Sequence, residues 1–190
     1  MNIGIFGGSF NPIHIGHCIV ANFIVQHSDL DEVWLNISPQ NPLKGIISKD
    51  LDTHRVKMTQ LAIENSPKLK VCTVEFDLPT PSYTISTLQF LKENYPQHQF
   101  RLIIGSDNWL VFDKWKDANK IISEFGVIVY PRPGYPILNT PIPGNVNVVD
   151  APQIEISSTF IRNGIKSGND MQFILPDKVR NYVLSNNLYK

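Results

Sequence analysis

The sequence predicts an α/β fold in which one parallel sheet carries helices on both faces. Two observations indicate it: short apolar runs of strand composition alternate with longer amphipathic segments, and glycine-rich or polar turns follow the first and fourth runs. Such alternation is typical of a doubly wound, Rossmann-like sheet, which binds ligands beyond the carboxyl ends of its strands. The expected strands are residues 2–6, 32–37, 70–74, 100–104, 126–129 and 146–149.

Length and composition restrict the function. A chain of 190 residues with 42% hydrophobic content can bury one full core, so we expect a single domain over residues 1–190. Lys plus Arg number 17, as do Asp plus Glu, so no basic field is available to hold nucleic acid. We see no targeting leader and no apolar run near the ~18 residues that cross a bilayer, and therefore expect no membrane contact and a cytoplasmic location. Cys18 and Cys72 are expected to be reduced core residues.

The first expected strand leads directly into a glycine-rich turn, after which a helix is expected to begin near Ile15. Gly7 and Gly8 carry no Cβ, so the backbone can approach a ligand closely. The amino terminus of a helix adds free N–H groups and a partial positive charge. Together these features predict a phosphate site, and it differs from a P-loop because no Gly-Lys-Ser or Gly-Lys-Thr follows the glycines.

Two histidines strengthen this prediction. His14 and His17 are three positions apart, so on a helix they would share a face and both could donate to one triphosphate. Another interpretation is that the pair only caps a helix and fills a turn. A zinc site that includes Cys18 is disfavoured, because no further Cys-x-x-Cys or His-x-x-x-His completes a ligand set.

A second candidate phosphate site lies near the carboxyl end. Ser157, Ser158 or Thr159 can cap a helix that includes Arg162 one turn further on. The planar, permanently charged guanidinium suits β and γ phosphates or departing pyrophosphate. The alternative is an ordinary capped surface helix with a solvated Arg162.

The sequence contains no evident Ser–His–Asp set, reactive cysteine or paired acidic cluster, so we expect no covalent intermediate. Positioning and charge neutralisation are sufficient for phosphoryl chemistry on a phosphorylated acceptor, because the phosphate of such an acceptor is already an anionic nucleophile. Mg²⁺ is expected as the cofactor, carried by the phosphates of the bound nucleotide, and no residue is expected to be a metal ligand.

Both motifs resemble known signatures. Gly8-Ser9-Phe10-Asn11-Pro12 with His14-Ile15-Gly16-His17 is similar to the first signature of the nucleotidylyltransferase superfamily, and the segment 156–162, Ile-Ser-Ser-Thr-Phe-Ile-Arg, is similar to the second. Over essentially the whole chain, the sequence resembles the bacterial nicotinate-nucleotide adenylyltransferases. The further segments that carry this resemblance are 82–85, 105–107, Trp115, 132–136 and 175–176.

The resemblance implies that AMP is transferred from ATP to nicotinate mononucleotide by direct in-line displacement, giving nicotinate adenine dinucleotide and pyrophosphate in NAD biosynthesis. The implied catalytic residues are His14, His17, Lys44 and Arg162. The implied ATP-binding residues are Gly7, Gly8, Ser9, Phe10, Gly16, Gly105, Asp107, Ile156, Ser157, Ser158 and Thr159. The implied nicotinate-nucleotide contacts are Asn11, Tyr83, Thr84, Trp109, Trp115 and Lys116.

The chain departs from the family pattern at three positions: Leu43, where relatives commonly have histidine, Ser86, where they often have aspartate, and Lys116, where they often have tyrosine. The alternative functions are a related adenylyl- or cytidylyltransferase with another acceptor, such as pantetheine phosphate or glycerol phosphate, and a non-catalytic nucleotide sensor. A class I aminoacyl-tRNA synthetase is excluded by chain length, neutral charge and the lack of a Lys-Met-Ser-Lys-Ser loop. A homo-oligomer is compatible with the sequence.

Overall fold

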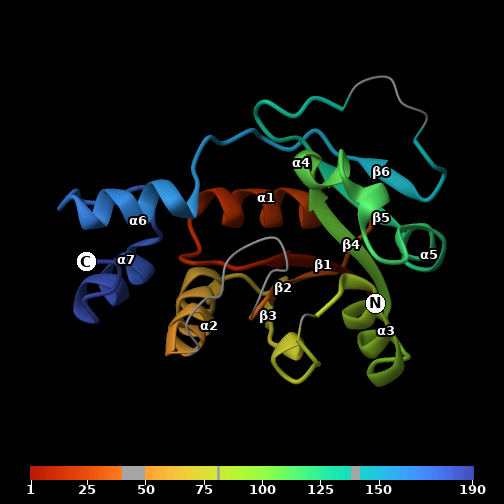
Figure 1. Cartoon of the computed structure of the whole chain (residues 1–190), viewed down its shortest axis with the longest axis horizontal. Helices are drawn as coiled ribbons and strands as arrows, with labels where there is room; N and C mark the ends of the chain where they lie inside the picture. Colours follow the sequence, from red (N-terminus) through yellow and green to blue (C-terminus); the bar gives the residue numbers. More distant parts are fainter. Residues whose placement is uncertain (40–49, 81, 138–141) are drawn as a thin grey trace.

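The computed structural model describes residues 1–39, 50–80, 82–137 and 142–190. These residues form one six-stranded sheet in the order β3-β2-β1-β4-β5-β6, in which every neighbouring pair is parallel (Figure 1). The predicted α/β, Rossmann-like fold is therefore confirmed. The strands are β1 (Asn2–Gly8), β2 (Glu32–Ile37), β3 (Leu69–Cys72), β4 (Gln99–Gly105), β5 (Val127–Tyr130) and β6 (Val146–Val148).

Helices cover both faces of this sheet. Because side chains alternate along each buried strand, both faces carry apolar side chains that the helices bury. In β1, Ile3 and Ile5 belong to the core beneath α3 and α5, whereas Phe6 belongs to the core on the opposite face, with α1, α2, α6 and α7. The α-helices are α1 (Ile15–Gln26), α2 (Asp50–Ile63), α3 (Thr84–Asn94), α4 (Ser106–Trp109), α5 (Ala118–Glu124), α6 (Ser158–Lys166) and α7 (Asp177–Ser185), and the short 3-10 helices are η1 (Val74–Phe76) and η2 (Phe112–Lys114).

The strand order reverses between β1 and β4, which are adjacent although almost a hundred residues separate them in the chain. Phe6 of β1 is level with Ile103 of β4, so the glycine-rich turn and Gly105 emerge next to each other at the carboxyl ends of the two strands. Ligands of open α/β sheets bind at this kind of reversal. The fold therefore places the site that the sequence predicts at the centre of the sheet.

The carboxyl-terminal segment returns to the first motif. After β6 the chain runs back above α1 to α6, and α7 follows at the same end of the molecule (Figure 1). Ile161 of α6 and Val179 of α7 belong to the same apolar core as Phe10 and Ile13. Burial of these side chains places the second motif against the first.

Both cysteines are free; Cys72 is buried and Cys18 is half-buried. Burial raises the pKa of each thiol to about 11, so both are protonated and unreactive at neutral pH. Among the described residues, no helix is long and apolar enough to cross a membrane.

Candidate active site

The turn between β1 and α1 has its carbonyl groups bound from outside. Arg55 Nη1 donates to the carbonyl of Ser9 at 2.7 Å, and Arg162 Nη1 donates to that of Asn11 at 2.8 Å. The hydroxyl of Ser158 donates to the carbonyl of Pro12 at 2.9 Å. In a planar trans peptide the N–H group points opposite to the carbonyl. The Ser9 carbonyl therefore directs the N–H of the next residue away from Arg55, as expected of an anion-binding turn.

Phe10 fixes the shape of this turn. Its φ is +43°, in the left-handed region that non-glycine residues rarely adopt, and its side chain is 1% exposed. The ring packs edge-on against those of Phe6 and His17, with centroids 5.9 and 5.1 Å away. A Cβ on Gly8 would lie 2.8 Å from this ring, so the position requires glycine. Because the ring is buried, Phe10 can contact a nucleotide through its backbone rather than its side chain.

The two histidines lie together, but not as predicted. His14 is the extended residue that precedes α1, so the prediction that both share a helical face is wrong. Their rings nevertheless lie in contact, with centroids 3.7 Å apart and planes tilted by 31°, and the backbone N–H of His14 donates to Nδ1 of His17 at 3.3 Å. The extended backbone at position 14 turns its ring back over the first turn of α1. A Cβ on Gly16 would lie 3.0 Å from the His14 ring, so glycine at this position eases the close approach.

His14 is neutral at physiological pH. Its side chain is 4% exposed, and burial, with a contribution from the charge of Arg132, lowers its pKa from 6.5 to about 4. A neutral imidazole still carries one N–H donor. His14 can therefore donate a hydrogen bond to an oxyanion without charge.

Arg132 is a site residue to which the sequence analysis gave no role. It follows β5, where its Nε lies 3.8 Å from Oδ1 of Asp107 and its backbone N–H donates to the hydroxyl of Ser106 at 2.8 Å. Arg132 lines a small recess of about 30 Å³ together with His14, His17 and Ile156. Its place at the carboxyl end of a predicted strand, within segment 132–136, was the available signal.

The lack of a side chain at Gly105 leaves room for Asp107 beside Arg132, because a Cβ there would lie 2.5 Å from Oδ1 of Asp107. The structure thus places Gly105 and Asp107 against Arg132, which lines the recess of the two histidines.

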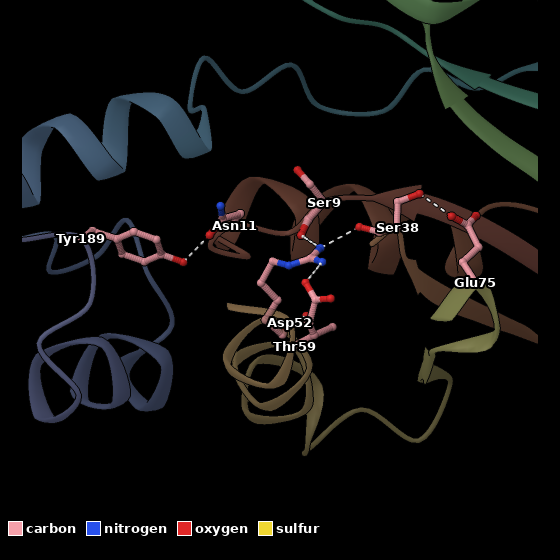
Figure 2. A network of polar contacts seen from close by, with 8 residues as sticks. Ser9, Asn11, Ser38, Asp52, Thr59, Glu75 and Tyr189 are labelled. Carbon is pink, nitrogen blue, oxygen red and sulfur yellow. Dashed lines mark hydrogen bonds and ion pairs between the residues drawn. The ribbon is translucent and has the colours of Figure 1, made fainter. Parts of the chain in front are cut away.

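The second motif forms the predicted capped helix. The hydroxyl of Ser157 accepts from the backbone N–H of Phe160 at 3.1 Å, which caps α6. Arg162 lies one turn further on, where its Nη2 also donates to the hydroxyl of Thr159 at 3.2 Å. Tyr189, near the carboxyl terminus, donates to Oδ1 of Asn11 at 2.6 Å (Figure 2).

A larger cavity of about 300 Å³ lies beside the glycine turn. Its lining includes Tyr83, Thr84, Trp115 and Lys116, which the sequence assigns to the acceptor nucleotide, and also Gly7, Gly8 and Gly105. Nζ of Lys116 lies 4.6 Å from the centre of the Tyr83 ring. Predicted acceptor residues from two separate segments are therefore brought together.

Two predicted acceptor contacts lie elsewhere. Trp109 is not among the described residues that line this cavity, and its ring stacks on Phe112 with centroids 5.4 Å apart. Asn11 also does not line the cavity in the described structure, and its side-chain oxygen is bound by Tyr189. Lys44 lies outside the described residues, and so does Leu43.

Comparison with known proteins agrees with this geometry. The model of the cytidylyltransferase-like family matches residues 5–164, so the fold and the paired motifs define a protein of the cytidylyltransferase-like class. A probable nicotinate-nucleotide adenylyltransferase of Bacteroides fragilis is 51% identical over 90% of this chain and 86% of its own, and one of Flavobacterium johnsoniae is 45% identical over the whole of both chains. The chain belongs to the nicotinate-nucleotide adenylyltransferase family of enzymes.

Structural comparison supports the same assignment. The nicotinic acid mononucleotide adenylyltransferase of Plasmodium falciparum, solved in complex with NaAD, superposes with a TM-score of 0.78. It is 25% identical, and the match covers 99% of this chain and 97% of that one.

The lowered pKa of His14 predicts pH-dependent stability. Because the unfolded chain takes up this proton near pH 6.5 and the folded chain only near pH 4, the free energy of unfolding should fall as the pH decreases between these values. The His14 contribution is at most about 3 kcal/mol. Denaturant unfolding of wild type and His14→Asn at pH 7 and pH 4.5 measures it, and asparagine is a favourable residue before a helix. His27→Asn is the control on an exposed histidine. If the free energy of unfolding changes equally with pH in wild type and His14→Asn, the lowered pKa of His14 is contradicted.

Proposed function

We propose that this chain transfers AMP from ATP to nicotinate mononucleotide, giving nicotinate adenine dinucleotide and pyrophosphate in NAD biosynthesis. One observation carries the proposal: Gly7 and Gly8 of the phosphate turn line the same cavity as Tyr83, Thr84 and Trp115. A nucleotide phosphate at the turn and an acceptor in the cavity would therefore be adjacent. The NaAD complex of the Plasmodium falciparum relative supports the same pair of substrates.

The reaction needs positioning and charge stabilisation more than proton transfer. A phosphate oxygen of the mononucleotide attacks the α phosphorus of ATP, a new P–O bond forms, and the bond to pyrophosphate breaks. The turn N–H groups, His14 and His17 donate to the triphosphate, and Arg162 with Arg132 supplies positive charge. No step requires a covalent intermediate on the protein.

Arg162 adopts a resting position in which its guanidinium is occupied by the Asn11 carbonyl and the Thr159 hydroxyl. Two hydrogen bonds leave other N–H groups of its five-donor fork available to phosphate oxygens. Lys44 adds a further cation in this proposal, as the family resemblance implies.

Mg²⁺ is the proposed cofactor, and the residues of the cleft fit it as an ion held by substrate. The described groups around the turn are mainly N–H donors, which bind phosphate oxygens rather than a cation, and the described residues contain no cluster of three or more metal-ligating side chains. Mg²⁺ that arrives on the ATP phosphates would neutralise part of their charge. The chain's own donors then fix the orientation of the phosphates.

The acceptor cavity suits a charged aromatic ring. The Trp115 ring offers a π surface to the positive pyridine nitrogen, and the first N–H groups of α3, at Thr84, can donate to the nicotinate carboxylate. Lys116 adds positive charge above Tyr83. Pantetheine phosphate and glycerol phosphate have no ring for this surface, so another acceptor is the weaker alternative.

Catalysis should depend on His17. His17→Ala removes a donor to the transferring phosphates, and the loss of such a donor typically lowers kcat by ~100-fold or more. We expect KM for ATP to change much less. Initial rates of pyrophosphate release measure both constants, and His27→Ala, at the far end of α1, should retain wild-type rates. Equal turnover by His17→Ala and wild type would remove His17 from the catalytic residues.

The acceptor is tested by turnover of a panel that contains nicotinate mononucleotide, nicotinamide mononucleotide and pantetheine phosphate with ATP and Mg²⁺. An amide presents an N–H group to donors that fit a carboxylate, so kcat/KM should favour the acid by roughly tenfold or more. Preference for nicotinamide mononucleotide would contradict the acceptor assignment and leave adenylyl transfer intact. Preference for pantetheine phosphate would favour the alternative transferase.

A further inference from the structure

A buried carboxylate forms part of the wall of the acceptor cavity, and the chemistry proposed above does not use it. Glu75 lies in η1 with 6% of its surface exposed, and it lines the cavity with Tyr83 and Trp115. A carboxylate at this depth costs free energy unless its oxygens are hydrogen-bonded. Its hydrogen-bond partners indicate what it does.

Both carboxylate oxygens of Glu75 are fully used. Oε1 accepts from Nδ2 of Asn36 at 2.6 Å and from Oγ1 of Thr87 at 3.1 Å. Oε2 accepts from Oγ of Ser82 at 2.9 Å and from Oγ of Ser38. Four donors occupy the four lone-pair sites of an ionised carboxylate. Glu75 is thus an anchor for these side chains and has no lone pair left for a substrate proton.

The anchored residues surround the start of α3. Ser82 lies just before Tyr83 and Thr84, and Thr87 lies in the first turn of the helix. We propose that Glu75 is a positioning residue for the acceptor nucleotide, because it fixes the amino terminus of α3 against the end of β2. This inference rests on the proposed function, in which Tyr83 and Thr84 contact the acceptor.

Ser38 connects this anchor to the phosphate turn. Its hydroxyl donates to Glu75, its backbone N–H donates to the carbonyl of Gly8 at 3.0 Å, and its carbonyl accepts from Arg55 Nη1 at 2.8 Å. Figure 2 shows Ser38 between Glu75 and Ser9. The same Arg55 nitrogen binds the Ser9 carbonyl. Glu75 therefore holds the acceptor end of the cavity at a fixed place relative to the turn that holds ATP.

Kinetic constants for the two substrates test the inference. Glu75→Ala leaves four donors without their acceptor and frees the start of α3, so KM for nicotinate mononucleotide should rise about tenfold or more, while KM for ATP stays within roughly twofold. Glu75→Gln keeps the shape and one accepting oxygen, so its KM for the acceptor should lie between wild type and Glu75→Ala. Pyrophosphate release at varied concentrations of each substrate provides both KM values for wild type and for each variant.

A matched pair of threonine variants separates positioning from stability. Thr87 and Thr59 are both buried hydroxyl donors, the first to Glu75 and the second to the carbonyl of Arg55 within α2. Both valine variants should lower the unfolding temperature, but only Thr87→Val should raise KM for nicotinate mononucleotide. If Glu75→Ala does not fold, the comparison of Thr87→Val with Thr59→Val tests the inference.

Unchanged acceptor KM in the folded Glu75 and Thr87 variants, with wild type active, would overturn the inference alone. Equal effects on the KM for ATP and the KM for the acceptor would also overturn it. A wild-type enzyme that fails to turn over nicotinate mononucleotide would overturn the proposed function, and this inference with it.

Discussion

The buried guanidinium of Arg55 is the interaction on which the geometry of the site depends. Its side chain is 0% exposed, it pairs with Asp52 at 2.6 Å, and one nitrogen joins the carbonyls of Ser9 and Ser38. Burial of a charge is costly unless it is paired and hydrogen-bonded, and removal of a buried partner typically costs ~3–5 kcal/mol. Arg55 thus has few alternative positions. It joins the ends of β1 and β2 at the point where the glycine turn begins.

The second motif supplies the remaining contacts of the same turn. Ser158 and Arg162 bind the Pro12 and Asn11 carbonyls, and Tyr189 binds the Asn11 side chain, although these partners are 146, 151 and 178 positions apart. Elements outside the turn therefore bind the carbonyls of Ser9, Asn11 and Pro12. The peptides that follow Ser9 and Pro12 direct the N–H groups of Phe10 and Ile13 to the opposite side of the turn. This explains why two short motifs from opposite ends of the chain form one site. Each motif also caps or begins a helix, so each brings a positive helix terminus with it.

Much of this could be predicted from the sequence, because local patterns specified it. All six strands lie within two residues of the apolar runs, and α1 and α6 begin where their motifs indicate. The prediction that His14 and His17 share a helical face is wrong, because His14 precedes Ile15, the first residue of α1. Trp109 follows Asp107 closely in the chain, but α4 turns its ring onto Phe112 rather than toward the cavity. Contacts of Arg55, Glu75 and Tyr189 gave no local signal, because their partners become neighbours only when the sheet forms.

The central claim is that the N–H groups of the glycine turn face the triphosphate while the carbonyl groups are held outward. The most direct measurement is the amide ¹H–¹⁵N spectrum of the protein titrated with Mg²⁺–ATP in the absence of acceptor. The amides of Ser9, Phe10 and Ile13 should shift together and saturate at the same ATP concentration as the imidazole signals of His17. ATP binding that shifts the His17 signals but leaves these three amides unchanged would contradict the account.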